Sequence, residues 1–348
     1  MPDGRDYIHA APALRLEPTG MVYRRQRLFD ITKRDPALDL HLVARLPDFM
    51  GRYRYVGAKK PLVIEPGDSG PLKPVGEVGS LLRKDDRLIV LERGATVRAY
   101  PVRLVRAYGS VMDTVDDTPV LITWSYYSQV ARCVVSRLDE AQVQIVDAGL
   151  SYRGCDMLSD AKTGSLWDTA AGKCVAGPMT GRELAMLPVQ IVEWQTWRPD
   201  HLDDVVLMPD SAERILGIPP APDADGADRR QRDVLDAYLE TDVVPFATAV
   251  FRPGEPASDA LPPKTYVLGV RTTAAVRAYP LNVVFSLAEH AVRDRMGDLD
   301  VSIQATSTRT GHVRPGSATG DDISQDVMLR FAWMELNPTT DVYAPPAE

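Results

Sequence analysis

The segment Arg87-Leu-Ile-Val-Leu-Glu-Arg-Gly-Ala-Thr-Val-Arg-Ala-Tyr-Pro-Val-Arg-Leu-Val105 decides the expected fold, because the chain contains a second copy of it. That copy is Tyr266-Val-Leu-Gly-Val-Arg-Thr-Thr-Ala-Ala-Val-Arg-Ala-Tyr-Pro-Leu-Asn-Val-Val284, which aligns without gaps and is identical at seven of the 19 positions. Runs rich in β-branched residues flank a short turn in each copy, and the proline suits the first turn of a helix. Each copy therefore predicts strand, tight turn, strand and short helix.

The similarity continues to residues 113–122 and 294–303 after a two-residue insertion. Two units of this size predict an internally duplicated fold rather than a long solenoid. Between them, residues 118–208 are rich in strand patterns, with strands expected at 122–127, 143–146 and 205–208. We therefore expect an α+β, mainly β fold in which two strand-turn-strand-Ala-Tyr-Pro-helix modules, at 87–122 and 266–303, enclose a β-rich middle segment.

The rest of the chain is less regular. Residues 1–80 are expected to be an N-terminal extension, with one helix at 37–50, and residues 81–345 to form the domain. A polar, proline-rich link starting at residue 219 precedes a helix expected at 228–240, and 243–251 has the pattern of a buried strand.

Composition excludes several classes of protein. The chain has 348 residues, a net charge of -8 and 45% hydrophobic residues, enough apolar material for a packed core. The sequence has neither an apolar run of transmembrane length nor a basic block, which argues against a membrane or nucleic-acid partner. It begins without the pattern of a signal peptide, so a cytoplasmic protein is expected, and its preference for arginine over lysine is typical of a GC-rich, actinobacterial genome.

Further motifs lie between and after the two copies. They are Pro119-Val-Leu-Ile-Thr123, Gly164-Ser-Leu-Trp167, Ala176-Gly-Pro-Met-Thr-Gly181, Leu187-Pro188, the Trp194 and Trp197 pair, Phe331-Ala-Trp333 and Asn337-Pro338. Together with the two Ala-Tyr-Pro segments, they make the chain resemble the uncharacterised DUF3179 family over residues 80–343. The resemblance implies a shared fold and no settled reaction.

The chain departs from the family pattern at two places. Where the family usually carries a His-Glu pair after the first Ala-Tyr-Pro, this chain has Tyr108 and Gly109. Where the family has Cys-Pro-Leu-Cys-Gly, this chain has Ser125-Tyr-Tyr-Ser-Gln129. An imidazole and two thiols suit a soft metal or a redox centre, and phenols and hydroxyls do not replace them as ligands. As a divergent member the chain is therefore expected to lack the metal and to use no cofactor.

The replaced positions define the candidate site. Aromatic faces combined with hydroxyl groups suit a pocket for an apolar substrate. The expected catalytic residues are Tyr108, Ser125, Tyr126 and Ser128; the expected substrate-binding residues are Trp124, Tyr127, Asp156, Trp167, Glu289 and His290. Strand alternation would place Trp124, Tyr126 and Ser128 on one face, and Ser125 and Tyr127 on the other. The competing interpretation is ordinary core packing for the aromatic residues and a solvated helix position for His290.

The sequence contains none of the common nucleotide-binding, zinc-protease or serine-hydrolase motifs. We therefore expect a cofactor-independent enzyme of specialised metabolism that catalyses a redox-neutral cyclisation, cycloaddition or isomerisation of an apolar, polyketide-like small molecule. Orientation of a flexible substrate alone contributes about 7–11 kcal/mol in favourable cases. Two alternatives stay open: a non-catalytic ligand-binding or assembly protein derived from a metalloprotein, and a metalloprotein whose ligands come from Glu289, His290 and aspartates. The sequence also leaves open whether the chain forms a homodimer.

Overall fold

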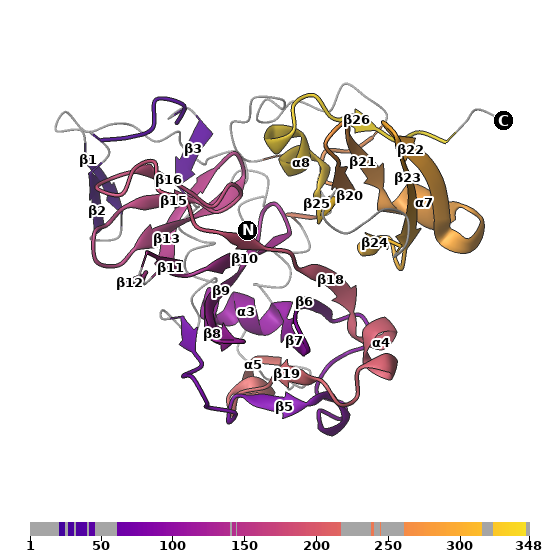
Figure 1. Cartoon of the computed structure of the whole chain (residues 1–348), viewed down its shortest axis with the longest axis horizontal. Helices are drawn as coiled ribbons and strands as arrows, with labels where there is room; N and C mark the ends of the chain where they lie inside the picture. The colour runs from indigo at the N-terminus through magenta and orange to yellow at the C-terminus, as the bar shows by residue number, and fades with distance from the viewer. Residues whose placement is uncertain are drawn as a thin grey trace, which may run out of the picture.

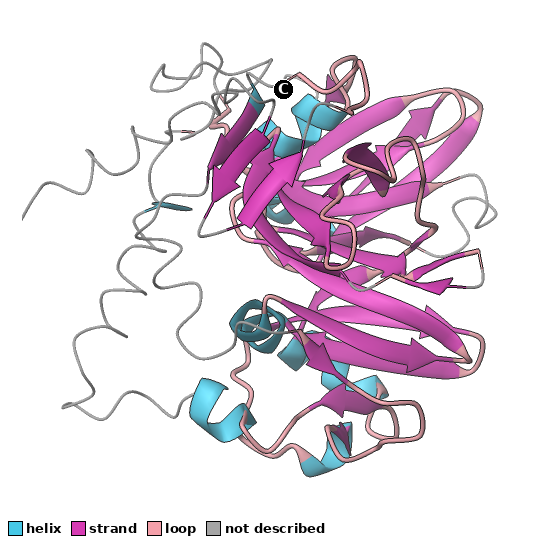
Figure 2. Ribbon diagram, turned by 90° about the vertical axis from the view of Figure 1, so that its left-hand side faces the viewer, coloured by secondary structure: helices cyan, strands magenta, loops and turns pink. Residues whose placement is uncertain are grey.

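The computed structural model confirms a mainly β fold with few, short helices (Figures 1 and 2). It describes residues 21–24, 27–30, 33–39, 42–45, 61–139, 141–143, 145–216, 238–239, 244, 261–314 and 323–345. In Figure 1 the strands of the first module lie in the lower part of the view, those of the C-terminal module at the right, and β13 to β16 at the left. Among the described residues, no helix is long and apolar enough to cross a bilayer.

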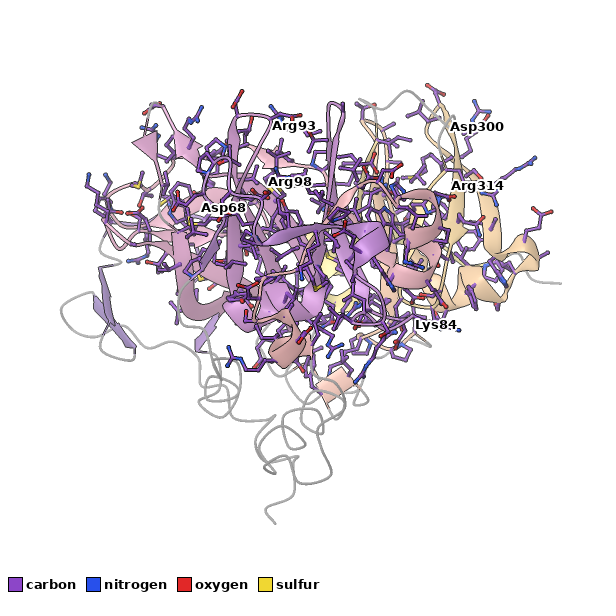
Figure 3. The ribbon with its side chains drawn as sticks, turned by 90° about the horizontal axis from the view of Figure 1, so that it is seen from below. Asp68, Lys84, Arg93, Arg98, Asp300 and Arg314 are labelled. Carbon is purple, nitrogen blue, oxygen red and sulfur yellow. The ribbon has the colours of Figure 1, made fainter. Side chains whose placement is uncertain are left out.

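The two modules share the order strand, strand, helix, strand, strand, and the second has an additional 3-10 turn. The first consists of β6 (Arg87–Arg93), β7 (Thr96–Pro101), α3 (Val102–Tyr108), β8 (Ser110–Val115) and β9 (Thr118–Ser125). The second consists of β20 (Tyr266–Arg271), β21 (Val276–Pro280), α7 (Leu281–Ser286), the 3-10 turn η4 (Ala288–His290), β22 (Ala291–Met296) and β23 (Leu299–Ala305). Arg93 on β6 and Asp300 on β23 are labelled on the same upper side of Figure 3.

In each module, strands from other parts of the chain pair with both edges of the first hairpin to form a larger sheet. The sheet β18-β6-β7-β19-β5 contains β18 (Gln190–Glu193), β19 (Val205–Leu207) and β5 (Leu72–Pro74). The sheet β25-β20-β21-β26 contains β25 (Ser324–Leu329) and β26 (Asp341–Val342). In both sheets an antiparallel strand flanks the hairpin on one side and a parallel strand on the other.

Two further sheets build the middle segment. One has the order β17-β10-β9-β8-β4, with β17 (Met186–Leu187), β10 (Val130–Val135) and β4 (Leu62–Val63). The other has the order β16-β15-β14-β13-β3, with β16 (Lys173–Ala176), β15 (Leu166–Asp168), β14 (Cys155–Asp160), β13 (Ile145–Tyr152) and β3 (Val43–Arg45). Leu121 and Val134 of the first sheet pack with Leu158 and Trp167 of the second in one buried cluster. The two sheets therefore face each other.

Short elements connect these sheets. They are β1 (Met21–Arg24), β2 (Arg27–Asp30), η2 (Val75–Glu77), β11 (Arg137–Leu138), β12 (Ala141–Gln142), α4 (Trp194–Trp197), η3 (Arg198–Asp200), α5 (Ala212–Leu216), β24 (Gly311–Val313) and α8 (Arg330–Leu336). Strands β4 and β5, within the expected N-terminal extension, pair with β8 and β19 of the domain.

Several sequence-based expectations need correction. The strand expected at 122–127 ends at Ser125, because the chain reverses through residues 126–129 so that β10 can pair with β9. The helix expected at 37–50 is wrong: Val43–Arg45 is a strand, whose pairing with β13 overrides local helix propensity. In the segment 143–146 the strand begins at Ile145. The helix expected at 228–240 and the strand expected at 243–251 lie outside the described residues, apart from Tyr238, Leu239 and Val244.

Candidate functional site

A small, partly open pocket lies between the two facing sheets of the middle segment. Its volume is about 10 Å³, roughly the space of one water molecule. Thr123 pairs with Arg132, and Ser125 with Val130, across the β9–β10 hairpin, so these four side chains share one face of the sheet. Residues of β14 and of the turn after β15 close the opposite wall. The lining residues are Gly109, Thr123, Trp124, Ser125, Val130, Arg132, Asp156, Leu158 and Thr169.

A hydrogen bond between Asp156 and Ser125 connects the two walls of the pocket. The backbone N–H of Asp156 donates to the hydroxyl oxygen of Ser125 at 3.1 Å. The hydroxyl of Thr169 donates to the carbonyl oxygen of Asp156. These contacts connect the two sheets at the pocket and bring a serine, a threonine and a carboxyl group from three chain segments together.

Arg132 supplies the positive charge of the pocket and is only 5% exposed. Its Nη1 donates to Asp326 Oδ1 at 2.7 Å and to the carbonyl oxygen of Ala131 at 2.9 Å, and its Nη2 lies 3.4 Å from Asp326 Oδ2. Its Nε has no hydrogen-bond partner among the residues that the structure describes. A buried donor without an acceptor costs about 1–3 kcal/mol, so this N–H favours an acceptor in the pocket.

Gly109 opens the pocket beside helix α3. It follows the last helical residue with a positive φ of 78°, and a Cβ added there would have no heavy atom within 4 Å. Tyr108 does not line the pocket; its hydroxyl is hydrogen-bonded to Ser211, just before α5. Gly109 and Ser125 therefore line one pocket, whereas Tyr108 links two helices.

The chain also matches one known protein family. The model of the family described as "Protein of unknown function (DUF3179)" matches residues 63–340, most of the chain. The chain belongs to the DUF3179 family. No curated protein and no solved structure gives a significant match. In this DUF3179 chain, the pocket contains Gly109 and Ser125, two of the positions at which we expect the sequence to depart from the family pattern.

The two tyrosines of the turn pack behind the pocket rather than in it. The rings of Tyr126 and Tyr127 meet edge to face at 5.2 Å, and Tyr127 meets Tyr238 in the same way at 5.3 Å. The Tyr238 hydroxyl donates to the Tyr127 carbonyl oxygen. Trp124 lines the pocket, but its ring stacks with the guanidinium of Arg87 at 4.8 Å. The strand ends at Ser125, so the expected alternation of side chains between the two faces does not extend to Tyr126, Tyr127 and Ser128.

Ser128 is fully buried beside Cys155. Burial raises the pKa of the Cys155 thiol to about 12, and the Ser128 hydroxyl offsets only part of that effect. The thiol is therefore protonated at neutral pH and is a poor nucleophile. Trp167 is buried in the cluster between the two sheets and does not line the pocket.

Glu289 and His290 lie in the second module. Both adopt positive φ angles, 57° and 51°, in the exposed turn η4. The His290 ring stacks on Phe285 at 4.2 Å, and its Nδ1 is 2.5 Å from the Phe285 carbonyl oxygen. Neither residue lines the pocket. The described part of the chain contains no group of three or more His, Cys, Asp or Glu side chains placed to hold a metal ion.

Sequence reasoning placed Trp124, Ser125 and Asp156 in the site, and all three line the pocket. It missed the other six lining residues, which are Gly109, Thr123, Val130, Arg132, Leu158 and Thr169. One signal could have found Arg132: it is the single charged residue in the apolar run of β10, which includes Val130, Ala131 and Cys133. A charged residue in a buried strand is rare unless it has a partner or a function.

Proposed function

We propose that this protein is an enzyme that catalyses a redox-neutral isomerisation or cyclisation of an apolar, polyketide-like carbonyl compound, with the carbonyl oxygen in the pocket. The observation on which the proposal rests is that Arg132, whose Nε has no hydrogen-bond partner among the described residues, and Asp156 line the same pocket. A pocket of about 10 Å³ admits about one oxygen atom, so the carbon skeleton of the substrate lies outside it.

The donors suit a carbonyl oxygen. The Nε–H of Arg132 needs an acceptor, and the hydroxyl groups of Thr123 and Ser125 lie on the same face of the hairpin. Donors that are fixed before the reaction stabilise an oxygen more strongly as negative charge develops on it. The arrangement therefore favours an enolate over the carbonyl compound from which it forms.

Asp156 is the base in this proposal. Its carboxylate takes a proton from the carbon next to the carbonyl group, and the electron pair of that C–H bond moves to give the enolate. The enolate then either takes the proton back at another carbon, which isomerises the substrate, or attacks an electrophilic carbon of the same molecule, which closes a ring. Neither route changes the oxidation level of the substrate, and Asp156 returns its proton at the end.

Deuterium exchange tests the reaction even when the product is unidentified. The protein is incubated in D2O with a panel of β-keto and α,β-unsaturated ketones, and mass spectrometry records exchange next to the carbonyl group. We expect exchange with the unaltered protein and a loss of about 100-fold or more with Asp156→Asn, since a positioned base contributes roughly 10²–10⁴-fold.

Asp168→Asn is the matched control, because Asp168 is an equally buried carboxyl group on the neighbouring strand that does not line the pocket. This variant should exchange deuterium as the unaltered protein does. Exchange that is equal in the Asp156→Asn variant, or absent from every ketone with the unaltered protein, contradicts the enzyme proposal.

A ligand-binding protein without chemistry is the second candidate. The observation that favours it is the volume of the pocket, which matches a single bound water or ligand oxygen. It predicts saturable binding of carbonyl compounds, weakened by Ser125→Ala, with no deuterium exchange at any pH.

A further inference from the structure

Arg132 reaches the pocket from β10, but its counter-charge comes from the C-terminal module. Asp326 lies on β25, 194 positions further along the chain, and binds both Nη groups of Arg132. The turn before β10 also contacts this strand, since the Leu329 N–H donates to the Ser128 carbonyl oxygen at 2.9 Å. The C-terminal module thus forms part of the pocket's surroundings.

Asp326 is itself held in place. Arg271 Nη1 donates to Asp326 Oδ2 at 2.9 Å, and Arg271 Nε donates to Asn337 Oδ1 at the same distance. The Arg271 guanidinium lies 4.4 Å from the centre of the Trp333 ring. These contacts fix the Asp326 carboxylate, which in turn binds the Nη groups of Arg132 and leaves its Nε without a hydrogen-bond partner among the described residues.

The formal charges of the two charged residues that line the pocket, Arg132 and Asp156, and of the two residues that hold Arg132 in place sum to zero. Arg132 and Arg271 contribute two positive formal charges, and Asp326 and Asp156 two negative ones. A neutral acceptor such as a carbonyl group preserves this balance, whereas a carboxylate would add an uncompensated negative charge in a buried place, which is strongly unfavourable.

We propose that Asp326 is the residue that positions Arg132 and sets the specificity of the pocket for neutral carbonyl groups over carboxylates. This inference rests on the proposed function for the location of the site and names the class of group bound there. Replacement of Asp326 by asparagine keeps the volume and one acceptor oxygen but removes the negative charge. In that variant the four residues sum to one positive charge, which a carboxylate in the pocket would neutralise.

Acetamide and acetate are the test pair, because they have nearly the same shape and differ in charge. The Nε–H resonance of Arg132, identified by its loss in Arg132→Lys, is followed in nitrogen-15 NMR titrations at constant ionic strength. In the unaltered protein acetamide should shift this resonance at lower concentration than acetate. In Asp326→Asn the ratio of acetate to acetamide affinity should rise by about tenfold or more, the effect of one charge-assisted hydrogen bond. A purely structural role would weaken both probes together and leave the ratio unchanged.

Asp341→Asn is the control, since Asp341 is a 74% exposed residue of the same C-terminal sheet that lies 3.6 Å from Arg277. It should leave the ratio unchanged. Asp326→Glu keeps the charge and displaces the carboxylate, so it should move the Arg132 resonance while acetamide remains preferred. If Asp326→Asn does not fold, an Arg132 resonance that is unchanged in Asp326→Glu overturns the proposal.

The outcomes separate this inference from the enzyme proposal. Selective binding of acetamide that is lost in Asp326→Asn supports the inference even if no ketone exchanges deuterium, in which case only the catalytic role fails. A ratio that is unchanged in Asp326→Asn overturns the inference whatever the exchange experiment shows. If neither probe shifts the Arg132 resonance in the unaltered protein, both proposals fail.

Discussion

The hydroxyl of Tyr100 donates a 2.7 Å hydrogen bond to the carboxylate of Asp113, and the same relationship recurs between Tyr279 and Asp294 at 2.8 Å in the second module. In both modules an arginine completes the group: Arg98 contacts Asp113 at 2.6 Å, and Arg277 contacts Asp294 at 2.5 Å. The Val-Arg-Ala-Tyr-Pro segment thus supplies the two donors that satisfy an aspartate on the following strand.

Replacement of these tyrosines should affect stability unequally. Asp113 is 1% exposed and Asp294 18%, so a lost donor is harder for water to replace at Asp113. We expect Tyr100→Phe to lower the free energy of unfolding by about 1.5–3 kcal/mol, and Tyr279→Phe by about 1 kcal/mol. Urea denaturation of the two variants measures the difference. Equal losses would contradict the burial argument.

Asp294 should make stability fall in acid. Burial acts to raise its pKa, but the hydrogen bonds from Arg277 and Tyr279 outweigh burial and lower it below 3.8. A carboxyl group with a lowered pKa stabilises the fold above its ordinary pKa, and this contribution is lost as the pH falls through the lowered value. Asp294→Asn should therefore be less stable than the unaltered protein at pH 7, with a smaller difference near pH 3. Urea denaturation at both pH values decides this.

Asp168 should make the stability of the fold decrease as the pH rises, the opposite of Asp294. Burial raises its pKa above 3.8, and hydrogen bonding by the Ala170 backbone N–H offsets burial only in part. The contribution of the protonated Asp168 carboxyl group to stability is fully present below pH 3.8, and it is lost as the pH rises through the raised pKa. Asp168→Asn, whose amide oxygen still accepts from Ala170, should therefore gain stability relative to the unaltered protein between pH 4 and pH 7. If the stability difference between the Asp168→Asn variant and the unaltered protein instead decreases from pH 4 to pH 7, the carboxylate is better solvated than its burial indicates. Urea denaturation at both pH values measures this difference.

Gly269 should tolerate no side chain. A Cβ added on β20 at this position would lie 2.1 Å from the Trp333 ring of α8. Gly269→Ala should therefore cost about 1–3 kcal/mol, and Trp333→Phe in the same chain should recover part of the loss. Gly76→Ala, where the closest atom is 3.4 Å away, is the control. Thermal denaturation of the single and double variants measures the coupling.

The three cysteines should resist alkylation while the protein is folded. Burial raises the pKa of Cys133 and Cys155 to about 12 and that of Cys174 to about 11, so thiolate is scarce at pH 8. Mass spectrometry after treatment with iodoacetamide should find no labelled cysteine in the native protein and three in urea. Rapid labelling of Cys155 in the native state would show that the cluster behind the pocket opens.

The sequence predicted the mainly β fold, and the pocket only in part. Turn residues and the Ala-Tyr-Pro segments are local signals, and they identified the hairpins β6–β7 and β20–β21 and the short helices α3 and α7 that follow them, but not the strands β8 and β22. Tyr126 and Tyr127 were expected to extend a strand because aromatic residues favour strands, but Gln129 adopts a positive φ of 56° within the turn that pairs β10 with β9. The partner of Arg132 comes from 194 positions away, a distance over which no local pattern operates.

The order in which the strands are synthesised has a consequence for the ion pair between Arg132 and Asp326. The parallel strand that completes the first sheet is available once Leu207 has been synthesised, whereas the second sheet waits for Val342. Asp326 emerges between these two events, so a nascent chain that has already built the β9–β10 hairpin holds an arginine whose counterion does not yet exist. If translation stops before β25, the Arg132 guanidinium is either exposed to water, which opens the hairpin, or buried without its counter-charge. Such fragments should be early targets for chaperones and proteases.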